Sequence, residues 1–81
     1  MKEYFMGKYI KNSVVQFNEN HKWCGSLGII NEVKHCGDDV RYMIGVPVPE
    51  KGIAYIFSME SKEEFEFIGM AVLAEVADKE E

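Results

Sequence analysis

The sequence predicts one small domain of the mostly β class, built as a barrel of about five strands. Three observations predict it: the chain has 81 residues, 47% of them are hydrophobic, and short β-like runs alternate with Gly, Asn, Asp and Pro clusters. A chain this short holds one core, and such runs at intervals of about a dozen residues are typical of hairpins in small barrels. We therefore expect a single domain over residues 1–81, with a core at 13–69, an N-terminal arm at 1–12 and a C-terminal extension at 70–81.

Residues 13–18 are the first predicted strand, and residues 19–25 are the loop that follows it. The strand is rich in β-branched and aromatic side chains, and Val15 and Phe17 lie one alternation apart on the same face. The loop is polar and turn-prone, and it carries Trp23.

Residues 26–34 and 40–46 are predicted to pair as a hairpin across a turn at residues 35–39. Gly28 lies inside the first of these strand patterns, which indicates a bend or a close backbone approach at that point. The second strand alternates apolar side chains onto one face, namely Val40, Tyr42, Ile44 and Val46.

Pro47 and Pro49 are predicted to turn the chain out of this strand, because neither has a backbone N–H for a central ladder. Residues 53–58 follow as the next strand. The pattern Ser61-x-x-Glu64 predicts a capping box that starts one helical turn, and residues 65–68 then resume a short strand.

The two ends of the chain have no clean period. Residues 1–10 fit an extra strand, a helical turn or a docked arm, and residues 70–77 fit a strand and a short helix equally well. The acidic residues concentrate at the C-terminal end, with eight acids and two lysines between Glu60 and Glu81. We expect this acidic end to be solvated.

The predicted core combines apolar residues from every strand. We expect Val15, Phe17, Ile30, Tyr42, Ile44, Ile56 and Phe65 to pack inside the barrel, with Gly28 placed where a Cβ would obstruct the curvature.

The composition narrows the classes of function. A net charge of −5 argues against general attraction to a phosphate backbone, although the part before Glu60 is nearly neutral and leaves room for a local basic patch. No apolar run approaches the roughly 18 residues that a membrane span needs. Two cysteines are too few for a disulfide scaffold, so we expect reduced thiols and a cytoplasmic location.

The order of the predicted strands and turns, together with Gly25-x-x-Gly28-x-Ile30, resembles an SH3-like barrel of the KOW or Tudor type. The glycine pattern is similar to the core of KOW motifs, and residues 64–69 look like the terminal strand of such a barrel. The resemblance covers roughly residues 13–69 and implies a stand-alone domain of the kind found in bacteria and phages. The usual surplus of Lys and Arg in nucleic-acid-binding KOW domains is absent.

Motifs for metal binding and catalysis are weak. His21, Cys24, His35 and Cys36 are possible zinc ligands, but the spacing does not match a zinc ribbon, and ordinary loop imidazoles and thiols are the favoured reading. No nucleophile elbow, Walker loop or dinucleotide-binding glycine pattern occurs. We therefore expect no enzymatic activity, no cofactor, no metal and no small-molecule substrate.

Aromatic side chains give the best candidate site. In barrels of this kind ligands usually sit on aromatics at the loops and strand ends. Core packing is the favoured interpretation for Trp23 and for Tyr42, the latter because it lies on the same alternation as Ile44. Tyr55 and Phe57 share one face of their strand, and they become exposed if Ala54 and Ile56 face inward. The candidate binding residues are Trp23, Tyr42, Tyr55, Phe57, Lys22 and Arg41.

These residues lead to two hypotheses of function. The first is a binding or scaffolding module that contacts a protein partner or a second copy of itself, without contact to a membrane. The alternative is a nucleic-acid-binding barrel, in which cations around the loops hold phosphates and Trp23 or Tyr55 stacks on bases. Its cations are Lys22, Lys34, Arg41 and Lys51.

Overall fold

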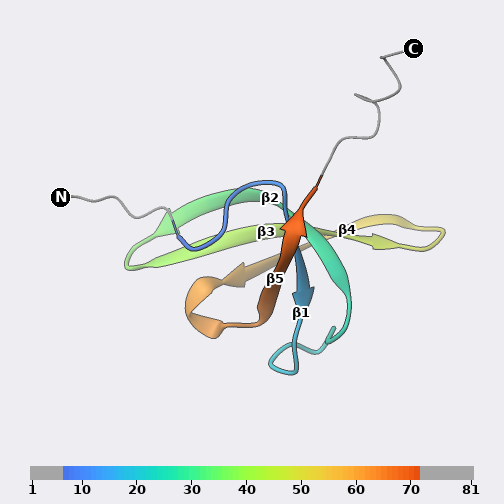
Figure 1. The fold of residues 1–81 in the computed structure, drawn as a ribbon, viewed down its shortest axis with the longest axis horizontal. Coiled ribbons are helices and arrows are strands. Elements are labelled where there is room, and N and C mark those ends of the chain that lie inside the picture. Colours follow the sequence, from blue (N-terminus) through green and yellow to red (C-terminus); the bar gives the residue numbers. More distant parts are fainter. Residues whose placement is uncertain (1–6, 72–81) are drawn as a thin grey trace, which may run out of the picture.

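The computed structural model describes residues 7–71, and most of this segment is β-strand (Figure 1). The strands are β1 (Ser13–Phe17), β2 (Leu27–Cys36), β3 (Asp39–Val48), β4 (Gly52–Met59) and β5 (Phe65–Met70), with one 3-10 turn, η1 (Glu60–Lys62), before β5. They form one antiparallel sheet in the order β4-β3-β2-β1-β5. The predicted mostly β class with about five strands is confirmed.

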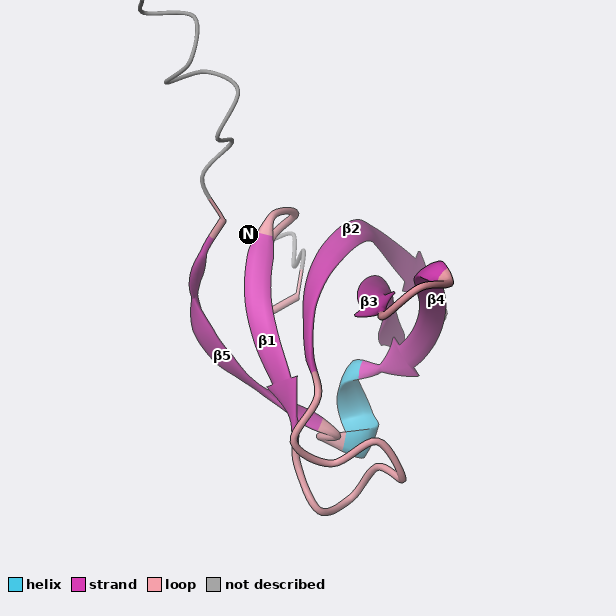
Figure 2. Cartoon of the chain, turned by 90° about the vertical axis from the view of Figure 1, so that its right-hand side faces the viewer, coloured by secondary structure: helices cyan, strands magenta, loops and turns pink. Residues whose placement is uncertain are grey.

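The sheet curls, so that one of its faces is concave and holds the core (Figure 2). The hairpins β2–β3 and β3–β4 project to opposite sides of the molecule (Figure 1). In β2 the pairing with β3 shifts between Ile30 and Glu32, which leaves Asn31 as an extra residue. Because an extra residue changes which side chains face inward, Ile30 and then Val33 both pack on the core.

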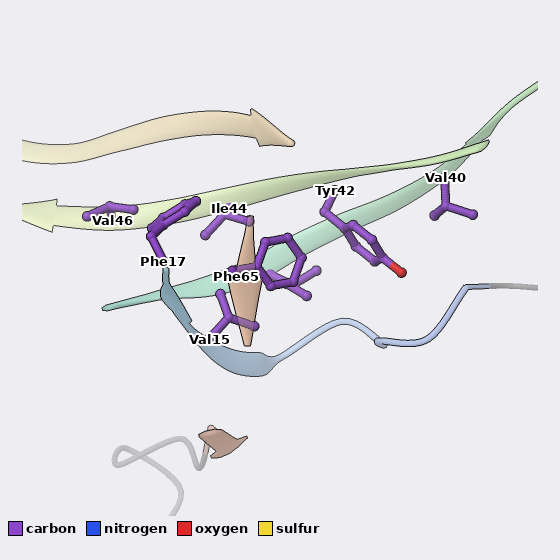
Figure 3. Close-up of a cluster of buried hydrophobic side chains, with 8 residues drawn as sticks. Val15, Phe17, Val40, Tyr42, Ile44, Val46 and Phe65 are labelled. Carbon is purple, nitrogen blue, oxygen red and sulfur yellow. The ribbon is translucent and has the colours of Figure 1, made fainter. Parts of the chain in front are cut away.

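The core consists of side chains from β1, β2, β3 and β5 (Figure 3). Six of the seven predicted core residues are buried, and Val40 and Val46 of the same β3 face join them. Ile56 is only half-buried, because it lies on β4 at the end of the sheet, where packing neighbours are found on one flank only. The buried apolar residues are Val15, Phe17, Ile30, Val40, Tyr42, Ile44, Val46 and Phe65.

Gly28 faces this core at a point of close contact. A Cβ built there lies 2.6 Å from Cγ2 of Ile44 and 3.0 Å from the backbone oxygen of Gly45. The expected close approach is therefore present, and a side chain is excluded by the facing strand β3.

The β2–β3 and β3–β4 hairpins are tighter than the sequence predicts. The predicted turn at residues 35–39 shrinks to two residues, because Cys36 pairs directly with Asp39. The prediction that Pro47 leaves the strand is wrong, since Pro47 pairs with Ile53 inside the β3–β4 ladder. The pairing of β3 with β2 ends at Gly45, and a proline is accepted where one flank of a strand has no neighbour.

The predicted helical turn is present, but the predicted capping box is not. The residue before η1 is Met59, and no side chain caps the turn. The Ser61 hydroxyl instead donates to Asp39 Oδ2 at 2.5 Å, and Glu64 Oε1 accepts from the Ser58 hydroxyl at 2.7 Å. Both residues of the pattern bind other elements, so they hold η1 to β3 and β4 rather than capping it.

The described part of the N-terminal arm, residues 7–12, is docked on the core of the sheet without regular secondary structure. Its Tyr9 ring lies 5.2 Å from the Phe65 ring and 5.6 Å from the Tyr42 ring, centroid to centroid. At the other end β5 continues to Met70, which pairs with Ser13. The predictions for residues 1–6 and 72–77 lie outside the described residues.

Candidate contact surface

Strand β4 carries three exposed apolar side chains on the convex face of the sheet: Ile53, Tyr55 and Phe57, here called the β4 strip. Tyr55 and Phe57 are each 54% exposed. Ala54 and Ile56 alternate with them and are half-buried on the concave side. Ala54 and Ile56 thus face inward, and Tyr55 and Phe57 are exposed, as expected for that orientation of the strand.

The strip lies over a glycine of the neighbouring strand. Tyr55 pairs with Gly45 of β3, and a Cβ at Gly45 would lie 3.3 Å from Ile53 Cγ2 and 3.5 Å from Tyr55 Cε1. The absence of a side chain at this position lets Ile53 and Tyr55 lie close to the sheet. On the other flank of Gly45 stands Ile29 of β2, which is also exposed, and the Asn31 side-chain amide lies over Gly45, with its Nδ2 3.2 Å from the same Cβ position, so the β4 strip borders a polar group there.

Arg41 lies at one end of the β4 strip. Its guanidinium carbon is 4.6 Å from the centroid of the Phe57 ring, a distance at which the cation is attracted to the ring face. Lys34 of β2 pairs directly with Arg41, so a second cation lies beside Arg41 on the flank away from Phe57. Of the six predicted binding residues, Arg41, Tyr55 and Phe57 are thus brought to one surface.

Tyr42 belongs to the core and is 0% exposed, so its side chain is not available to a surface ligand. Its hydroxyl oxygen accepts the Tyr9 backbone N–H at 3.3 Å, and burial raises the pKa of this phenol. The ring stands nearly perpendicular to Phe65, with 5.5 Å between the two centroids. Tyr42 therefore holds the N-terminal arm against the core. Its alternation with Ile44 in the sequence predicts the buried position, but not the contact with the arm.

Trp23 and Lys22 lie on the loop between β1 and β2, away from Arg41. The half-buried Trp23 packs against the core cluster. With Lys22 and residues 46–49 of β3 and its turn, it lines an open hollow of about 420 Å³. Pro47 belongs to this hollow and also pairs with Ile53, so the hollow and the β4 strip adjoin at that residue.

This loop is held by hydrogen bonds within itself and to the residues after η1. Asn18 Oδ1 accepts the Asn20 N–H at 2.8 Å, and Gly25, with a φ of 95°, donates its N–H to the Phe17 carbonyl at 2.8 Å. The side-chain amides of Asn18 and Asn20 both donate to the Glu63 carbonyl at 3.0 Å. Trp23 is thus presented by a well-connected loop.

Of the possible zinc ligands, His21 and Cys24 lie on the β1–β2 loop, and His35 and Cys36 lie at the end of β2. Within residues 7–71 no group of three or more His, Cys, Asp and Glu side chains is placed to hold a metal ion. The His21 Nδ1 accepts the Trp23 N–H at 2.9 Å, and the His21 ring lies 4.4 Å from the Phe17 ring. These contacts give His21 a structural role in the loop.

An acidic hollow that sequence reasoning missed lies on the side of the barrel where the N-terminal arm docks. Its volume is about 350 Å³, and Tyr9 and Phe65 contribute to its wall. The Lys8 N–H donates to Glu60 Oε2 at 3.0 Å across it. No local pattern predicts this hollow, because the lining residues come from the arm, the β1–β2 loop and the η1–β5 segment, namely Lys8, Tyr9, Asn18, Glu19, Asn20, Glu60, Glu63, Phe65 and Glu66.

Asp39, at the start of β3, accepts three hydrogen bonds. Its carboxylate takes the Ser61 hydroxyl at 2.5 Å, the Ser61 N–H at 3.1 Å and the Val40 N–H at 2.8 Å. These bonds, that of the Ser61 hydroxyl first, lower the pKa of Asp39 below its usual 3.8. The cluster therefore fixes η1 against β3, and it has a structural role.

Comparison of the chain with family models, with curated proteins and with solved structures finds no match. No helix of the described residues has both the length and the apolar character needed to cross a membrane.

Proposed function

We propose that this chain is a non-catalytic protein-interaction module of the SH3-like barrel type, and that the β4 strip is the centre of its contact surface. The observation that carries the proposal is the exposure of Tyr55 and Phe57, at 54% each, side by side on one face of β4. Aromatic side chains with Arg at their edge are the composition that protein interfaces favour. The five-stranded antiparallel sheet with η1 between β4 and β5 supports the barrel type.

A reducing compartment fits the two cysteines, and on that basis we place the module in the cytoplasm. Cys24 is an exposed free thiol and Cys36 a half-buried one. Their chemistry suits an environment in which thiols stay reduced.

The proposal is tested by affinity capture from the host with three forms of the protein. We expect the wild type to retain a protein partner, the Tyr55→Ala/Phe57→Ala double variant to lose it, and the control Ile68→Ala to keep it. Ile68 is a suitable control because it is 55% exposed on β5, at the other end of the sheet. A wild type that stays monomeric and recovers nothing beyond nucleic acid contradicts the proposal.

Nucleic-acid binding is the second candidate, and the group of Lys34, Arg41 and Phe57 favours it. Arg41 over the exposed Phe57 ring, with Lys34 paired to Arg41 on the neighbouring strand, combines phosphate attraction with a stacking platform. If this function holds, retention on single-stranded RNA or DNA falls as salt rises, and Arg41→Ala weakens it further, because counterion release drives such binding. No retention at low salt removes this candidate.

A further inference from the structure

β4 is an end strand of the sheet, and within residues 7–71 no charge, proline or register shift protects its edge. Among the described residues it pairs with β3 on one flank and with no strand on the other (Figure 2). Gly52–Met59 contains no charged residue and no proline, and its eight pairs with β3 run without a register shift. Such an edge presents unpaired N–H and C=O groups as a template for another strand.

β5, the other end strand, differs in charge and in the regularity of its pairing. It carries the exposed charge of Glu66, and its pairing with β1 shifts between Val14 and Val15. The Tyr9 ring also stacks beside Phe67, with 6.4 Å between centroids and 17° between planes. A charge, an irregular register and a docked arm are devices that discourage strand addition, so the two edges are protected unequally.

We propose that β4 pairs antiparallel with β4 of a second copy of this chain, which joins the two sheets into one. The inference rests on the proposed function, and it specifies that the protein partner is a second copy of this chain. Residues of one face meet residues of the same face in such a pairing. The β4 strip therefore meets the β4 strip of the second copy, and aromatic and isoleucine side chains of both copies become cross-strand neighbours.

The charges at the ends of β4 favour the antiparallel over the parallel direction for a second copy. Glu50 and Lys51 lie directly before the strand, and Glu60, whose Oε2 accepts the Lys8 N–H, lies directly after it. A two-fold axis places the Lys51 end of each strand near the Glu60 end of the other, whereas a parallel pairing would place the two Glu60 ends side by side. The strip between these ends carries no charge of its own, and the equally apolar strip of the second copy covers it.

Sedimentation velocity over a concentration series tests the pairing with one variant on each edge. We expect the wild type to pass from monomer to dimer as concentration rises, and Tyr55→Lys to raise the dissociation constant about tenfold or more, because it places a cation in the apolar strip. Ile68→Lys is the matched control, since Ile68 and Tyr55 are 55% and 54% exposed, and it leaves the constant unchanged.

Hydrogen exchange of the wild type locates the interface without any substitution. The amides of Gly52–Met59 are expected to gain protection as concentration rises, while those of Phe65–Met70 do not. A wild type that is monomeric throughout, or a dimer protected at β5 and weakened by Ile68→Lys, overturns the inference. A monomer that still captures a protein through Tyr55 and Phe57 overturns the pairing alone, whereas a monomer that captures no protein overturns the proposed function as well.

Discussion

Phe65 and Phe57 are residues of the same type on opposite faces of one sheet. Phe65 is 6% exposed and touches the rings of Tyr9, Phe17 and Tyr42, whereas Phe57 is 54% exposed and has Arg41 over its ring. The concave face thus holds the chain together, and the convex face of β4 contributes little to that. An apolar surface that the fold does not use is available for contacts with another molecule.

The largest expected effect is the loss of a side chain from the concave face. Ile44→Ala should lower the free energy of unfolding by about 2 to 5 kcal/mol, because Ile44 is fully buried and its removal leaves a cavity. Ile53→Ala, the same change on the convex face, should cost well under half as much. Urea titrations at a concentration where the protein is monomeric measure the free energy of unfolding of both variants. Equal losses for the two variants would contradict the claim that the concave face stabilises the fold more than the convex face.

The next largest effect is expected from adding a side chain at Gly28, where the concave face has no room for one. Gly28→Val should destabilise by about 1 to 3 kcal/mol, because its Cβ would lie 2.6 Å from Ile44 Cγ2. Gly69→Val is the control, since a Cβ there meets nothing within 4 Å. Thermal melts of the two variants separate crowding from the general cost of replacing glycine in a strand, and a lower melting temperature for Gly69→Val would contradict this account.

A smaller effect is expected from the tyrosine hydroxyls of the two faces. Tyr42→Phe should cost about 0.5 to 1.5 kcal/mol, because the Tyr9 N–H loses its acceptor. Tyr55→Phe should change stability very little, because its hydroxyl makes no hydrogen bond within the part of the chain that the structure describes. The readout is the midpoint of denaturant unfolding, and equal midpoints for these two variants would show that the arm is not held through Tyr42.

The smallest effect concerns Asp39 and depends on pH. The folded pKa is lowered, so the contribution of the carboxylate is present above its usual pKa of 3.8 and is lost as pH falls below that value. Ser61→Ala removes the main cause of the lowering. Melting temperatures of the wild type and this variant should differ at neutral pH and converge in acid; a difference that stays constant down to pH 2 would contradict the assignment.

The sequence predicts the β architecture well, because alternation along a strand is a local signal. That Tyr42 and Ile44 share a face, and that Tyr55 and Phe57 share a face, follows from the period of two alone, whereas the face of the sheet that each pair takes depends on the β3–β4 register. Gly28 could be identified as special from its place in a strand, although only the facing Ile44 shows that crowding is the reason.

Features that depend on contacts between distant segments could not be predicted in this way. The Ser61-x-x-Glu64 pattern suggests a cap, yet Asp39 and Ser58 take these side chains because the fold brings β3 and β4 beside them. The docking of Tyr9 likewise depends on β3 and β5. For the same reason Trp23 and Arg41 were grouped in one candidate site, whereas the fold places only Arg41 beside the β4 strip.

The most direct test of the two-face account is a pair of measurements on Phe57→Ala, with Phe65→Ala beside it. The account predicts that Phe57→Ala keeps a free energy of unfolding within about 1 kcal/mol of the wild type when both are monomeric, yet loses association. Phe65→Ala should lose about 3 to 5 kcal/mol. A Phe57→Ala protein that associates as the wild type does, or that unfolds as readily as Phe65→Ala, would contradict the claim that the convex face of β4 is a contact surface.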